Sequence, residues 1–156
     1  MSRWCYGNWA MAAVVIDEDG EVCPLSEIAA RYGLKAEGYY EEKGLLGSTY
    51  YALDDLTGAM DNRDEGFVNV YAHLRVTDRG GATRVHELSC EGYCGCDDDC
   101  YMLLIVTPGS DAESTEVEFQ TVDKVELTEA VGEDRFNDWW NSSECESPRE
   151  LDSPLF

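Results

Sequence analysis

Four cysteines within eleven residues form the group whose types and spacing most directly suggest chemistry. They are Cys90, Cys94, Cys96 and Cys100, in the stretch CEGYCGCDDDC. Four thiolates suffice for a closed tetrahedral site, so the stretch is a candidate site for a Zn²⁺ cofactor. It lacks the two C-x2-C pairs that are the strong signature of such sites. A disulfide between Cys90 and Cys100, or uncombined thiols at a turn, are the alternatives.

The two histidines, His73 and His86, are the second candidate. A hairpin turn centred on Gly80 and Gly81 would place both on one face of a strand pair, beside Tyr71. Two imidazoles beside a tyrosine could perform acid–base chemistry, whereas a polar, half-exposed sheet face is the simpler interpretation. The sequence contains no nucleophile elbow, phosphate-binding loop or dinucleotide fingerprint. We therefore expect that the protein is not an enzyme.

Strands must position both groups. Residues 67–76 alternate between apolar and polar side chains and predict a strand, and residues 83–90 predict the returning strand. Residues 101–106 form an unbroken apolar run, typical of a central strand that is covered on both faces. Residues 116–122 alternate again. Together these segments predict a four-stranded antiparallel meander, with the cysteine stretch at a hairpin tip.

Shorter elements flank the predicted meander. Residues 12–24 predict an N-terminal hairpin that turns at Asp19-Gly20. Residues 24–33 predict a short helix that ends at Gly33, while residues 37–46 and 49–60 are weaker helical candidates. Residues 133–140 predict a closing helix that docks Phe136, Trp139 and Trp140. We therefore expect an α+β fold with a single domain over residues 1–141, followed by an acidic tail over residues 142–156.

Residues 26–46, SEIAARYGLKAEGYYEEKGLL, resemble the N-terminal helix-turn-helix of MerR-type regulators. The matching positions are Glu27, Ile28, Ala29, Gly33, Tyr39, Tyr40, Glu41, Gly44, Leu45 and Leu46. The resemblance implies a DNA-recognition helix. This sequence departs from the pattern, since the segment before Tyr39 is shorter and Gly38 stands where the family has arginine. The acidic surroundings oppose contact with DNA phosphates.

Charge is the dominant global property. The chain of 156 residues carries 33 acidic and 11 basic residues, a formal net charge of −22. Such a chain is repelled by nucleic-acid phosphates and by anionic membranes, so basic protein surfaces are the favoured partners. No apolar run approaches the ~18–20 residues of a membrane span, and the first residues lack the order of a signal peptide. Seven cysteines cannot all pair within one chain, which favours a cytoplasmic location.

The amount of charge suggests nucleic-acid mimicry. A compact domain of this length is roughly 39 Å across, and duplex DNA of that length carries about 23 phosphate charges. We therefore expect a non-enzymatic interaction protein, similar in class to viral anti-restriction and anti-CRISPR inhibitors, that blocks the basic groove of a nucleic-acid-binding protein. A virion assembly protein and a salt-adapted domain with a zinc-stabilised hairpin are the alternatives. The expected partner-binding residues are Asp97, Asp98, Asp99, Glu113, Glu116, Glu118, Trp139 and Trp140.

Overall fold

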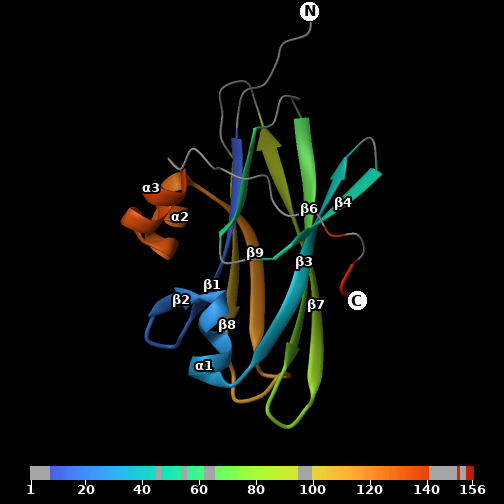
Figure 1. Ribbon diagram of the computed structural model, residues 1–156, viewed down its shortest axis with the longest axis vertical. Helices are drawn as coiled ribbons and strands as arrows, with labels where there is room; N and C mark the ends of the chain where they lie inside the picture. Colours follow the sequence, from blue (N-terminus) through green and yellow to red (C-terminus); the bar gives the residue numbers. More distant parts are fainter. Residues whose placement is uncertain are drawn as a thin grey trace, which may run out of the picture.

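The computed structural model describes residues 8–44, 47–53, 56–61, 66–94, 100–140, 151 and 154–156, which form two β-sheets and a pair of helices in three layers (Figure 1). The elements are β1 (Asn8–Ile16), β2 (Val22–Pro24), the 3-10 turn η1 (Leu25–Glu27), α1 (Ile28–Tyr32), β3 (Lys35–Gly44), β4 (Gly47–Ala52), β5 (Leu56–Asp61), β6 (Gly66–Thr77), β7 (Thr83–Cys94), β8 (Cys100–Thr107), β9 (Glu116–Val122), α2 (Lys124–Val131) and α3 (Glu133–Trp140).

The middle layer, which we call the central sheet, is built around β1. This strand pairs in parallel with β8, and β9 pairs with the far side of β8 in antiparallel orientation. The other edge of β1 is shared by β5 along its first half and β2 along its second half, both antiparallel. The predicted N-terminal hairpin is confirmed, since Ile16 pairs with Val22 across the Asp17–Glu21 turn.

Both faces of the central sheet are buried. Met102, Leu104 and Val106 of β8 pack into the core between the two sheets. Tyr101 and Leu103 alternate with them and face the helices, where Leu127 of α2 and Phe136 of α3 complete a second core. The predicted two-sided cover of residues 101–106 and the docking of Phe136 are therefore confirmed.

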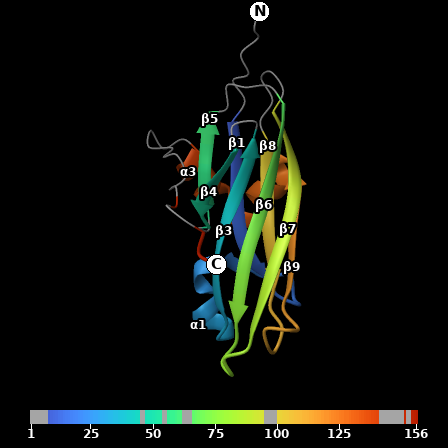
Figure 2. The same cartoon turned by 90° about the vertical axis from the view of Figure 1, so that its right-hand side faces the viewer.

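The second sheet, which we call the outer sheet, has the order β4-β3-β6-β7 and is antiparallel throughout. Its inner face packs on the central sheet through Tyr40 of β3 and through the apolar positions of β6, which are Val70, Ala72, Leu74 and Val76. Side chains alternate along each strand, so the intervening residues point away from the central sheet. Figure 2 looks onto this second face, which we call the open face.

The predicted single meander is wrong, although the mostly β character with short flanking helices fits the α+β class. β6 and β7 belong to the outer sheet, and β8 and β9 belong to the central sheet. The chain thus passes from one sheet to the other after β7 instead of turning back along it. The reason lies in β8, whose apolar side chains on both faces need cover on both sides. A position in the middle layer, beside β1, supplies that cover.

The two weaker helix predictions are also wrong. Residues 37–46 lie mostly in β3, and residues 49–60 lie mostly in β4 and β5. In β3, Tyr39 and Tyr40 face opposite sides of the outer sheet, which is the two-residue period of a strand. The predicted short helix is confirmed as α1, and it ends at Gly33 in the left-handed conformation (φ 67°). A strand follows it directly, so the recognition helix that the MerR-type resemblance implies is not formed in this segment.

Within the described residues, none of the helices combines the length and the apolar character that crossing a bilayer would require.

Candidate interaction surfaces

The cysteine stretch connects the two sheets. Cys90 is half-buried on β7, packs against the inter-sheet core and pairs with Val70 of β6, whereas Cys100 begins β8 and pairs with Trp9 of β1. The expected position at a hairpin tip is therefore wrong, because β7 and β8 do not pair. Cys96 and the aspartates Asp97, Asp98 and Asp99 lie outside the described residues, as do the side chains of Cys94 and Cys100.

Among the residues that the structure describes, no group of three or more His, Cys, Asp or Glu side chains is placed to hold a metal ion. The zinc site at Cys90, Cys94, Cys96 and Cys100 stays a prediction.

The two histidines point to opposite faces of the outer sheet, so the prediction of a shared face is wrong. His73 pairs with Glu87 and His86 pairs with Leu74. The cause is the β6–β7 turn: Asp78 still pairs with Ala82, which leaves a three-residue loop with Gly81 at φ 85° instead of a two-residue turn. A change of one residue in register moves every following side chain to the other face.

His86 lies on the inner face and is only 8% exposed. Burial lowers its pKa, the nearby Arg84 guanidinium lowers it further, and Glu116 opposes the shift. Its Nε2 atom is buried without a hydrogen-bond partner in the described part of the chain. Because His73 faces the other way, the structure offers no paired imidazoles for acid–base chemistry.

The open face carries a cluster of aromatic and charged side chains around Tyr39. The Tyr39 ring stacks on His73 at 4.5 Å between centroids and meets Tyr50 edge-on at 5.5 Å. Glu41 Oε2 lies 3.4 Å from His73 Nε2, and both side chains are 16% exposed. Burial raises the pKa of Tyr39, and Glu41, Tyr50 and Glu87 add to that shift. The hydroxyl therefore stays neutral around pH 7.

The last stretch of the chain contacts this face. The Leu151 amide donates a hydrogen bond to the Tyr50 carbonyl (2.8 Å), and the Phe156 ring lies between Tyr39 and Arg75. The division into a domain over residues 1–141 and a tail over residues 142–156 stays a prediction, but the described part of the predicted tail packs on the outer sheet.

The opposite side of the molecule is acidic. Residues 111–138 carry ten acidic residues and two basic ones, Lys124 and Arg135. Val117 and Phe119 of β9 point into the inter-sheet core, so Glu116 and Glu118 point to the side that α2 and α3 cover. We call the exposed acids of this side the acidic face; they are Glu116, Glu118, Asp123, Glu126, Glu129, Glu133, Asp134 and Asp138.

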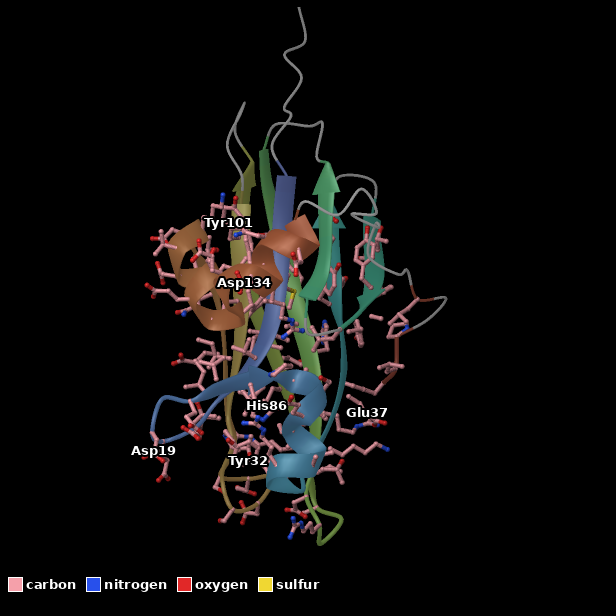
Figure 3. The ribbon with its side chains drawn as sticks, turned by 60° about the vertical axis from the view of Figure 1, so that its left-hand side comes forward. Asp19, Tyr32, Glu37, His86, Tyr101 and Asp134 are labelled. Carbon is pink, nitrogen blue, oxygen red and sulfur yellow. The ribbon has the colours of Figure 1, made fainter. Side chains whose placement is uncertain are left out.

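The helices present their acids to solvent because their apolar residues are used for docking. Phe136 is buried under α3, and Asp134 and Asp138 lie one turn apart on the opposite side of that helix. Asp123 caps α2 by accepting a hydrogen bond from the Glu126 amide (2.8 Å). Figure 3 shows Asp134 on α3, far from Asp19 at the tip of the β1–β2 turn.

The expected partner-binding residues meet different outcomes. Glu116 and Glu118 belong to the acidic face, and Glu113 is exposed in the loop before β9, where its carbonyl accepts a hydrogen bond from Arg84 (2.7 Å). Trp139 and Trp140 end α3, but their side chains lie outside the described residues. Binding by any of these residues stays a prediction.

A cleft of about 360 Å³ lies where the end of α1, the β6–β7 turn and the β8–β9 loop meet. It was not predicted from the sequence. It is lined by Tyr32, Gly33, Leu34, Asp78, Arg79, Gly80, Ser110 and Asp111. Its two carboxylates are engaged by backbone amides: Asp78 accepts from Ala82 and Ala112, and Asp111 accepts from Ser114. The bonds from Ser114 lower the pKa of Asp111. These contacts hold the β6–β7 turn against the β8–β9 loop and indicate a structural role for this region.

The tyrosine cluster and the contact with Phe156 were likewise not foreseen. The alternation of residues 35–44 could have revealed the cluster, had the segment been taken as a strand. The contact with Phe156 leaves no local signal, because it joins segments that lie far apart in the sequence.

The fold and its surfaces thus define a two-sheet sandwich with a helical layer, an acidic face and an aromatic open face. No family model, curated protein or solved structure matches this chain.

Proposed function

We propose that the protein is a non-enzymatic interaction protein that uses its acidic face to occupy a basic surface of a nucleic-acid-binding partner, in place of nucleic acid. The observation that carries this proposal is the concentration of ten acids against two bases in residues 111–138. A partner's arginine and lysine side chains would meet carboxylates that stand clear of the protein body on two helices and an edge strand. An inhibitor of the anti-restriction or anti-CRISPR class would work in this way.

The arrangement of the acids favours a directed surface over charge that merely solubilises the protein. Among the described side chains, the open face mixes Lys35, Lys43 and Arg75 with Glu37, Glu41 and Glu87. The acidic face sets eight acids beside Lys124 and Arg135, and Arg84 of β7 lies 4.0 Å from Glu116 at its edge. A charge distribution of this kind orients a protein as it approaches a basic partner and accelerates association at low salt.

A pair of matched variants tests the proposal. Glu118→Gln, Glu129→Gln and Asp138→Asn together neutralise three acids of the acidic face, and Glu18→Gln, Asp19→Asn and Glu21→Gln neutralise three in the β1–β2 turn. Both variants therefore carry the same net charge. Wild-type protein immobilised as bait should retain a basic protein from host lysate until the salt is raised, and should compete with duplex DNA for that protein.

We expect the acidic-face variant to bind that partner about tenfold more weakly or worse, since each contacting charge contributes up to about 1 kcal/mol. The turn variant should bind like the wild type. Equal losses in both variants would contradict the proposal and would favour adaptation to high salt, which a melting curve across salt concentrations then checks.

A further inference from the structure

The last described residues of the chain sit on the open face in the manner of a bound peptide. β4 is an edge strand of the outer sheet, and an edge strand presents backbone groups that no neighbouring strand uses. The Leu151 amide donates to one of these groups, the Tyr50 carbonyl, at 2.8 Å. Main-chain pairing at a sheet edge is a common way in which domains hold extended peptides.

An aromatic side chain completes this contact. The Phe156 ring lies 4.4 Å from the guanidinium carbon of Arg75, measured to the ring centroid, and 5.7 Å from the Tyr39 ring at an angle of 61°. A guanidinium over a ring face and a second ring at a steep angle are the two favourable arrangements for an aromatic group. The three side chains come from β3, β6 and the last residue, so the contact joins distant parts of the sequence.

Tyr39, on which the Phe156 ring packs, has further ring contacts within the outer sheet. Tyr39 is held between His73 and Tyr50 and is 5% exposed, although it belongs to the face that points away from the core. Leu155 beside Phe156 is 53% exposed, and Val85, which pairs with Arg75, is 46% exposed. Leu155 belongs to the terminal segment itself, so it is Val85 that extends the apolar surface of the open face beyond the area that the Phe156 ring covers.

Charge also suits an extended ligand here. Among its described side chains, the open face carries Lys35, Lys43 and Arg75 against Glu37, Glu41 and Glu87, which balance one another on a protein of net charge −22. Residues 142–156 contain four acids and one arginine. An acidic segment meets less repulsion on this face than it would on the acidic face.

We propose that the open face is a binding site for an extended peptide that carries an aromatic side chain, and that Leu151 and Phe156 occupy this site within the chain and compete with such a peptide. Phe156 fills the position between Tyr39 and Arg75. The proposal is independent of the acidic face, which lies on the other side of the central sheet.

The test uses the full chain with Phe156→Ala, which empties the position of the ring. The probe is the peptide LDSPLF, blocked at both ends, and the matched control peptide is LDSPLA. Binding is followed by NMR through the ring signals of Tyr39 and His73. We expect saturable binding of LDSPLF to the variant at a concentration on the order of millimolar. Apparent binding to the wild type should be about twofold weaker, because a tethered segment competes at a similar effective concentration. Arg75→Ala added to the variant should weaken binding about threefold, as expected for loss of a cation–π contact.

The proposal is overturned if the variant does not bind LDSPLF, if LDSPLA binds equally well, or if the wild type binds as tightly as the variant. The wild type provides a second test that does not depend on the folding of the variant. Excess LDSPLF should shift the ring signals of Phe156 to those of a solvent-exposed ring. Unchanged Phe156 signals would overturn the proposal by themselves.

Discussion

The two sheets differ in how many of their faces a neighbouring layer covers. The central sheet packs on the outer sheet on one side and on α2 and α3 on the other (Figure 1). In the described part of the chain, the open face of the outer sheet is contacted by Leu151 and Phe156 instead of a further layer. The central sheet is therefore specified by burial on both faces. The outer sheet has a second face on which tyrosines, a histidine and charged groups can be placed without loss of the core. The comparison separates the part of the molecule that maintains the fold from the parts that are available for binding.

The largest effects on stability should come from substitutions at adjacent positions of one strand. Both positions should matter on a strand of the central sheet, but only one of the two on a strand of the outer sheet. On β8, Leu103→Ala and Leu104→Ala should each lower the free energy of unfolding by about 2–5 kcal/mol, because the two side chains fill different cores. On β6, Leu74→Ala should have an effect of the same size, but Arg75→Ala should stay below about 1 kcal/mol. Urea unfolding measures all four. A loss for Leu103→Ala as small as that for Arg75→Ala would mean that the helices do not cover β8.

A smaller effect should come from the contact that joins the sheets. Asp78 accepts hydrogen bonds from Ala82 within the outer-sheet turn and from Ala112 in the loop between β8 and β9. Asp78→Ala should lower the free energy of unfolding by about 1.5–3 kcal/mol, the range for hydrogen bonds to a charged group. Asp17→Ala is the matched control, since Asp17 accepts from two amides of its own turn only. Equal losses for the two variants would show that the link between the sheets adds nothing.

The smallest effect should appear in the pH dependence of stability. The folded structure lowers the pKa of His86 from its ordinary value of 6.5, so the unfolded chain binds a proton at a higher pH than the folded one. The contribution of neutral His86 to the free energy of unfolding is fully present above about pH 6.5. It is lost as the pH falls through the folded pKa, by about 1.4 kcal/mol for each unit by which the folded pKa lies below the unfolded one.

Urea midpoints between pH 7.5 and pH 5 measure this loss. His86→Gln should reduce it, whereas His73→Gln, which changes the open face, should retain it. A loss that persists unchanged in His86→Gln would contradict the assignment to the inner face.

The sequence predicted some of these features and could not predict others. The run at residues 101–106 showed that β8 is covered on both faces, and the alternation of β6 showed which of its residues enter the core. Neither pattern identifies the neighbouring strand, so the parallel partner β1 and the change of sheet after β7 were not foreseen. The histidines were misplaced because the loop has three residues where Gly80-Gly81 suggested two.

The acidic face was predicted in part. Glu116 and Glu118 were named from the alternation of their strand, which shows that they point away from the inter-sheet core. The acids of α2 and α3 were counted in the net charge without being assigned to a surface, because the side that a helix exposes depends on the sheet against which it packs.

The parallel pairing of β1 with β8 sets the order in which this chain can fold. Trp9 pairs with Cys100 and Val15 with Val106, a separation of 91 residues in each case. Pairings between such distant segments form slowly, because a large loop must close before the contact adds stability. The paired strands of the β1–β2 hairpin and of the β6–β7 ribbon are adjacent in the sequence, so each pair can form early during synthesis. One edge of β1 stays unpaired until β8 has left the ribosome, and in that interval this edge is exposed to aggregation.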